Sequence, residues 1–127
     1  MAHKCKGNWK SWINPPNPLP KVPNDGIIEV GAVSGTGSFS GTHQKSGKPL
    51  KDGKCKDNPH NIDFKREEGT KKYHYKGDIT QEVIDGDLTP VVRNGTCKIT
   101  STTDAKAKRR PKAQDAGDEE WQAEKTT

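Results

Sequence analysis

The stretch 35–47, which reads GTGSFSGTHQKSG, constrains the fold of this chain more than any other segment. Its first two glycines flank a single threonine, and glycine adopts the positive φ of a tight turn without steric cost. Strand-forming residues lie on both sides of that turn, IIEVGAV in 27–33 and SFSGTHQ in 38–44. The stretch therefore predicts a β-hairpin, and Gly41, two residues after Phe39, leaves room for a neighbouring aromatic ring.

Several other segments are predicted to be strands, and in 61–66 and 71–80 apolar and polar residues alternate as they do in a half-buried strand. They are GNWKSWI (7–13), NIDFKR (61–66), KKYHYKGDIT (71–80) and TCKITST (96–102). Turns are predicted at 68–70, at Asp85-Gly86 and at Asn94-Gly95, where small or flexible residues suit tight hairpins. The whole pattern predicts an all-β fold, a small antiparallel barrel or sandwich of about seven to eight strands without a helix.

A proline-rich stretch, 14–25, separates the first two predicted strands and holds five of the nine prolines of the chain. Proline fixes φ and lacks the N–H that a strand interior needs, so this stretch is predicted to be a loop. Two interpretations stay open: a stiff connector, or a polyproline ligand for an aromatic groove.

The pattern stops near residue 103. Only 27% of the residues are hydrophobic and 31% are charged, so the core is thin or part of the chain is unfolded. A basic block, 104–112, is followed by an acidic block, 113–127. The sequence therefore predicts a β-barrel domain over 1–103 and a disordered charged tail over 104–127, with a short helix or a last strand around Trp121 as alternatives.

The net charge of +5 permits binding to nucleic acid or another polyanion. The basic residues of the loop predicted over 45–61 and of the tail are the candidates for that contact: Lys48, Lys51, Lys54, Lys56, Lys108, Arg109 and Arg110. No membrane-spanning segment or signal peptide is expected from the sequence, although a form from which an export signal was removed would read the same. The compartment and the oligomeric state stay open.

The three cysteines lack the Cys-x-x-Cys spacing and the close histidines of a zinc site, so neither a metal nor another cofactor is predicted. A disulfide between Cys55 and Cys97 is favoured because both lie within the part of the chain that is predicted to fold. Three free thiols are the alternative in a reducing compartment.

The order of three motifs resembles a known family. GNW near the start, an apolar strand and then GTGSFSGTH are similar to the first three strands of the avidin and streptavidin family, and EEWQAEK around Trp121 looks like the opening of that family's last strand. The resemblance covers about a third of the chain. It implies an eight-stranded up-and-down barrel whose open mouth holds a small ligand.

The resemblance also implies site residues. Ser11 stands where the family has a residue that hydrogen-bonds the biotin ureido group, His43 replaces a tyrosine, and Lys45 replaces a serine or threonine. The family's tryptophans on the penultimate strand have no counterpart in TCKITST. We therefore predict a mouth lined by Trp9, Ser11, His43 and Lys45 that takes a small polar or aromatic ligand other than biotin.

No catalytic motif supports an enzyme, because the four histidines lack a ligand spacing and no serine lies in a nucleophile-elbow context. Three functions remain. The first is a non-catalytic module that binds a small ligand at the barrel mouth. The alternatives are a basic barrel that binds nucleic acid or another polyanion, and a secreted interaction or inhibitor module that acts through its loops.

Overall fold

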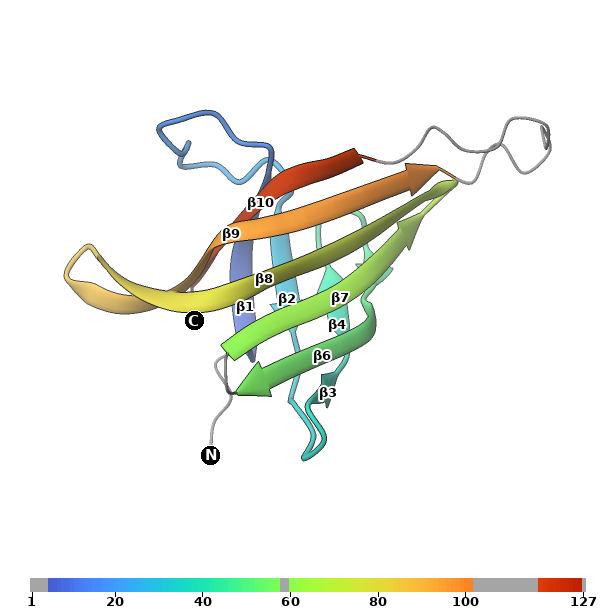
Figure 1. The fold of residues 1–127 in the computed structure, drawn as a ribbon, viewed down its shortest axis with the longest axis horizontal. Coiled ribbons are helices and arrows are strands. Elements are labelled where there is room, and N and C mark those ends of the chain that lie inside the picture. Colours follow the sequence, from blue (N-terminus) through green and yellow to red (C-terminus); the bar gives the residue numbers. More distant parts are fainter. Residues whose placement is uncertain (1–4, 58–59, 102–116, 127) are drawn as a thin grey trace.

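The computed structural model describes residues 5–57, 60–101 and 117–126. These residues form ten strands and no helix, in one antiparallel sheet that curls on itself (Figure 1). The strands are β1 (Gly7–Ile13), β2 (Ile27–Val30), β3 (Ser38–Phe39), β4 (Gly41–His43), β5 (Lys48–Pro49), β6 (Lys51–Asp57), β7 (His60–Glu68), β8 (Lys71–Ile84), β9 (Asp87–Ser101) and β10 (Gly117–Lys125). The all-β prediction is confirmed. Within the described ranges no helix is long and apolar enough to span a membrane.

The strand count exceeds the predicted seven to eight because two strands are interrupted by one residue each. Ser40 separates β3 from β4, and Leu50 separates β5 from β6. The sheet order is β3-β6-β7-β8-β9-β10-β1-β2-β4-β5. β3 pairs with β6 while β4 pairs with β2 and β5, so the short stretch 38–43 reaches both margins of the sheet. The sheet is curled enough for one stretch of chain to join its two sides. The loop predicted over 45–61 is thus largely strand, in β5 and β6.

β10 corrects the prediction of a wholly disordered tail. It pairs with β9 on one side and β1 on the other, near the middle of the sheet order. Trp121 and Ala123 point into the core and are fully buried, so this charged segment still carries the alternation that a strand needs. The alternative of a last strand around Trp121 is confirmed. The predicted boundary at 103/104 lies outside the described residues.

The core is aromatic. The rings of Phe64 and Tyr75 stack with centroids 4.6 Å apart, and the Trp121 ring meets both edge-on. Gly95 makes room for that tryptophan, since a Cβ at this position would lie 2.7 Å from Trp121 Cε3. The predicted Asn94-Gly95 turn is therefore wrong: β9 continues through these residues, although its register with β8 and with β10 shifts between Val92 and Thr96. Glycine at position 95 leaves space for the tryptophan ring.

The other predicted turns are confirmed. Asp85 and Gly86 both have positive φ at the tip of the long β8–β9 hairpin. Gly69 turns β7 into β8. The opening hairpin also forms, with Ile28 opposite His43 in the pairing of β2 and β4.

The proline-rich loop covers the outer side of β1. Trp12 faces away from the aromatic core, yet it is buried, and its Nε1 donates a hydrogen bond to the Pro20 carbonyl at 3.1 Å. The absence of strand over 14–26 agrees with the predicted loop. These contacts favour the stiff connector, because the loop already has an aromatic partner within its own chain.

The disulfide joins Cys5 to Cys55, and Cys97 is a buried free thiol. The predicted bond between Cys55 and Cys97 is wrong, because β7 and β8 lie between β6 and β9 in the sheet. Burial first, and the negative charge of Asp25 second, raise the pKa of the Cys97 thiol to about 12.

Candidate functional site

A cavity of about 390 Å³ opens at one end of the curled sheet. In a curled antiparallel sheet, the ends of many strands lie at the same end of the sheet. Residues that are distant in sequence therefore meet there. The lining residues are Ile13, Asn24, Asp25, His43, Lys45, Ser46, Arg66, Glu68, Tyr73 and Ile99. Two predicted site residues, His43 and Lys45, are among them.

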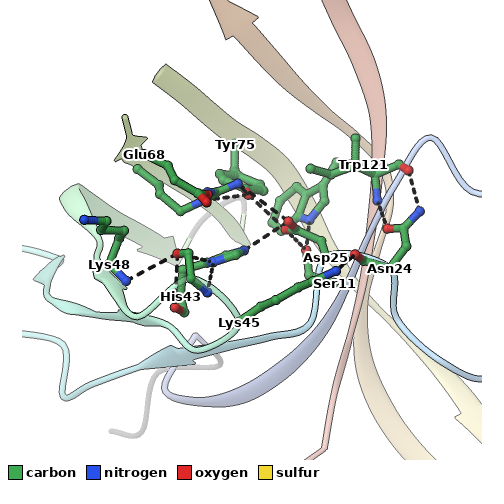
Figure 2. A network of polar contacts seen from close by, with 12 residues as sticks. Ser11, Asn24, Asp25, His43, Lys45, Lys48, Glu68, Tyr75 and Trp121 are labelled. Atoms are coloured by element: carbon green, nitrogen blue, oxygen red, sulfur yellow. Dashed lines mark hydrogen bonds and ion pairs between the residues drawn. The ribbon is translucent and has the colours of Figure 1, made fainter. Parts of the chain in front are cut away.

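Asp25 is the centre of a buried polar network at the floor of this cavity (Figure 2). Its Oδ2 accepts hydrogen bonds from Ser11 Oγ at 2.8 Å and from Tyr75 OH at 2.9 Å. Its Oδ1 lies 3.0 Å from His43 Nε2 and 3.6 Å from an Arg66 guanidinium nitrogen. A buried carboxylate needs such partners, because water no longer solvates it.

Backbone contacts hold Asp25 in this position. Its N–H donates to the Ser11 carbonyl at 3.0 Å, and the Ser11 N–H donates to the Gly26 carbonyl at 2.9 Å. The neighbouring Asn24 side chain accepts from the Ile13 N–H at 2.8 Å and donates to the Ile13 carbonyl at 2.9 Å. The end of the proline-rich loop is therefore fixed to β1 like a short added strand.

Arg66 provides the positive charge of the network and is only 2% exposed. Its Nη2 and Nε donate to the Tyr75 hydroxyl at 3.1 and 3.3 Å, and Nη1 pairs with Glu68 at the rim. The guanidinium also lies over the Tyr73 ring, 3.7 Å from the centroid. Burial disfavours its charged form, but Tyr75 and then Asp25 outweigh burial, so the pKa of Arg66 is raised.

Tyr75 is held in its neutral form by the same surroundings. Burial first, and the Asp25 charge second, raise the pKa of Tyr75 far above the usual tyrosine range, although Arg66 opposes them. A neutral phenol donates one hydrogen bond and accepts others. Tyr75 therefore links the carboxylate of Asp25 to the guanidinium of Arg66.

His43 has a defined tautomer. Its Nδ1 lies 3.2 Å from the Ser46 backbone N–H, which can only donate, and 2.7 Å from Ser46 Oγ. Nδ1 is therefore an acceptor, and Nε2 carries the proton that is donated to Asp25. The neutral imidazole thus connects Ser46 to the Asp25 carboxylate.

The other two predicted residues lie deeper than expected. Ser11 is fully buried beneath Asp25, and the Trp121 indole donates to its hydroxyl at 2.9 Å. Trp9 faces the interior as predicted, but its Nε1 donates to the Cys5 carbonyl and it does not line the cavity. The structure thus brings Ser11, His43 and Lys45 into one region and leaves Trp9 below it.

Several contributors went unrecognised in the sequence, among them Asp25, Ser46, Arg66, Tyr73 and Tyr75. For Arg66 the signal was present, because it continues the inward alternation of Ile62 and Phe64 along β7. No sequence pattern predicts that Asp25 is buried, because it lies in a polar loop. The path of that loop is defined only by its contacts with the assembled sheet.

The predicted polyanion contacts that the structure describes lie on β5 and β6. Lys54 and Lys56 line a groove of about 770 Å³ on the outer face of β6 to β9, where Asp52, Asp63 and Asp78 interrupt the lysines. Lys51 lies 3.6 Å from Glu67, and Lys48 is exposed on β5. Lys108, Arg109 and Arg110 lie outside the described residues. Polyanion binding stays a prediction.

The described part of the chain contains no group of three or more His, Cys, Asp or Glu side chains that could hold a metal ion. Comparison with models of protein families, with curated protein sequences and with solved structures finds no match.

Proposed function

We propose that this chain is a small-ligand-binding β-barrel module with its site in the cavity at the Asp25 end. Counting β3 with β4 and β5 with β6 gives eight consecutive antiparallel strands, in the order expected of an up-and-down barrel. This strand order supports the barrel architecture that the avidin-like sequence motifs imply. Mouths of small barrels are common places for ligand sites.

The observation that carries the proposal is the lining of the cavity. Its apolar wall is made by the half-buried side chains of Ile13, Tyr73 and Ile99, which pack against the core. Lys45 and the buried polar network supply the charged and polar groups of the cavity. Ligand pockets combine apolar walls with a few fixed polar groups in this way.

The depth of the cavity limits the ligand. Asp25 already accepts hydrogen bonds from Ser11, Tyr75 and His43. Protein groups thus satisfy one another at the floor of the cavity. A ligand therefore meets Lys45, Tyr73 and the upper side of the network rather than Ser11 or Trp9. We infer a small molecule with an aromatic or apolar body and one polar or anionic end, and not biotin in its family pose.

Nuclear magnetic resonance titration with benzoate and benzamide tests this proposal. We expect saturable shifts of backbone amides at Ile13, Lys45, Tyr73 and Ile99. Lys45→Ala should weaken benzoate binding at least threefold and leave benzamide nearly unchanged. Leu88→Ala, at an exposed apolar position of the distant β8–β9 hairpin, is the matched control and should change neither. Shifts confined to the Val83 and Leu88 region, or none that saturate, would overturn the proposal.

A further inference from the structure

Three side chains at the cavity form a continuous chain of hydrogen bonds. Ser46 Oγ lies 2.7 Å from His43 Nδ1, and His43 Nε2 lies 3.0 Å from Asp25 Oδ1. All three residues line the cavity of about 390 Å³. We propose that Ser46 is a nucleophile activated by His43 and Asp25, and that the cavity is a site of acyl transfer from small esters.

The protonation pattern is the one that such activation needs. The Ser46 backbone N–H at 3.2 Å marks Nδ1 as an acceptor, which leaves the proton on Nε2 facing the carboxylate. The Ser46 hydroxyl has two acceptors within reach, Nδ1 at 2.7 Å and the His43 carbonyl at 3.4 Å. The shorter contact directs the hydroxyl hydrogen to the imidazole. A serine, a histidine base and a carboxylate that orients the base are the three roles of a nucleophilic triad.

The two ring nitrogens are used in the reverse sense from the usual serine-protease triad, in which Nδ1 faces the carboxylate. The chemistry depends on one nitrogen accepting and the other donating, and both conditions are met. Asp25 is also fixed by Ser11 and Tyr75, so the carboxylate does not need to reorganise when the imidazole becomes charged.

Access and charge agree with this role. His43 is buried, whereas Ser46 is partly exposed and reaches the cavity. Lys45 and Arg66 line the same cavity, and their positive charge would favour a developing oxyanion there. The apolar wall of Ile13, Tyr73 and Ile99 offers a place for the acyl group of a small aromatic ester.

The proposed step balances as follows. Ser46 Oγ forms a bond to the ester carbonyl carbon while its proton moves to His43 Nδ1. The bond from that carbon to the leaving oxygen then breaks, and the alcohol departs with the proton from Nδ1. The product is an ester on Ser46, which water can cleave with His43 again as the base.

A purely structural role for Ser46 makes a different prediction. Its Oγ also lies 3.3 Å from the Lys48 N–H, within the turn between β4 and β5. A hydroxyl that only caps this turn would react no faster than other surface serines. A fluorophosphonate probe separates the two roles, because it bonds covalently to activated serines with loss of fluoride and spares ordinary ones.

The test is labelling of the full-length chain with a fluorophosphonate, read by intact mass and by mapping of the modified peptide. We expect one adduct, on Ser46, that Ser46→Ala abolishes and that Asp25→Asn and His43→Gln each slow at least tenfold. Ser34→Ala, in a serine and threonine cluster remote from any histidine contact, is the matched control and should label at the wild-type rate. Circular dichroism shows which variants are folded, and Ser46→Ala, at a surface turn, is the decisive one.

No adduct on Ser46 in the wild-type chain, or equal labelling of several serines, would overturn the proposal. This outcome is separate from the failure of reversible binding, since benzoate and benzamide need no nucleophile. Saturable binding of benzoate and benzamide without labelling of Ser46 would support the binding module and contradict the acyl-transfer site.

Discussion

Two arginines organise two polar clusters on opposite faces of the sheet. Arg66 belongs to the buried Asp25 cluster, which consists of Ser11, Asp25, His43, Arg66 and Tyr75 and lies inside the curled sheet. Arg93 belongs to the outer Arg93 cluster, which consists of Glu82, Arg93, Gln122 and Glu124. The side chain of Arg66 is 2% exposed and that of Arg93 is 30% exposed.

The outer Arg93 cluster has the better geometry. Arg93 donates to both oxygens of Glu82 at 3.0 and 2.8 Å and to Glu124 at 2.9 Å, whereas the closest approach of Arg66 to Asp25 is 3.6 Å. From the hydrogen-bond distances alone, the outer Arg93 cluster would be expected to contribute more to stability. Burial reverses the ranking, because charges inside the protein interact more strongly and lose more when a partner is removed. The free energy of unfolding that a mutation removes therefore depends more on the cost of leaving a buried partner unpaired than on the strength of the bond itself.

Replacement of Asp25 by alanine should have the largest effect. It removes the buried carboxylate near Arg66, which keeps its pairing with Glu68 at the rim, and it removes the acceptor of three further hydrogen bonds. We expect the free energy of unfolding to fall by about 3–5 kcal/mol in urea titrations. Asp25→Asn is the matched control and should lose less, because its amide oxygen still accepts. A loss below about 1 kcal/mol for the alanine variant would place this cluster in the same class as a surface ion pair.

Removal of a single hydroxyl tests the link inside the cluster. Tyr75→Phe keeps the ring stacked on Phe64 but deletes the oxygen between Asp25 and Arg66. We expect a loss of about 1–3 kcal/mol, because buried partners stay unsatisfied. The Tyr73 ring lies under the Arg66 guanidinium. Tyr73→Phe keeps this ring, and it should lower the free energy of unfolding clearly less in the same urea titration. Equal losses would show that the Tyr75 hydroxyl between Asp25 and Arg66 contributes no more to stability than the Tyr73 hydroxyl does.

The sequence accounts for much of the inner surface of the sheet. Alternation in 61–66 and 71–80 places Ile62, Phe64 and Tyr75 inside, as the structure has them. This works because side chains on a strand alternate between faces without exception unless a bulge intervenes. The same rule, carried two residues further along β7, would have placed Arg66 inside as well.

The parts that escaped prediction depend on contacts between distant segments. Gly95 resembles a turn glycine, and only the position of Trp121 shows why a strand needs it. Cys5 resembles an unstructured end, and only the closeness of its Cα to that of Cys55, 6.2 Å, makes it the disulfide partner. Asp25 has the composition of a loop residue, and its burial follows from the path of 24–26 along β1. The local sequence pattern carries no information on any of these contacts between distant segments.

Replacement of Arg93 by alanine should have a smaller effect than either change in the buried cluster. Water replaces the lost partner at Glu82 and Glu124, so we expect a loss of about 0.5–1 kcal/mol at low ionic strength. Salt should reduce this loss further, because exposed charges are screened. Urea titrations at two sodium chloride concentrations measure it. The loss for Asp25→Ala should hardly change with salt, and a parallel decrease in both would remove the contrast between the clusters.

Acid titration should give the smallest effect and resolves the outer Arg93 cluster further. The hydrogen bonds from Arg93 are the main cause that lowers the pKa of Glu82, and burial opposes them. An acid with a lowered pKa in the folded state stabilises the fold above its unfolded pKa, about 4.3 for glutamate. That stabilisation disappears as the pH falls through the folded pKa. Glu82→Gln should therefore be less stable than the wild type at neutral pH, and the difference should vanish once the pH has fallen below the lowered pKa of Glu82 in the folded state. Because the Glu82 side chain is 43% exposed, solvent keeps the difference small. A difference that persisted at the lowest pH would assign the effect to the shape of the side chain, and the outer cluster would then owe its stability to packing rather than to charge.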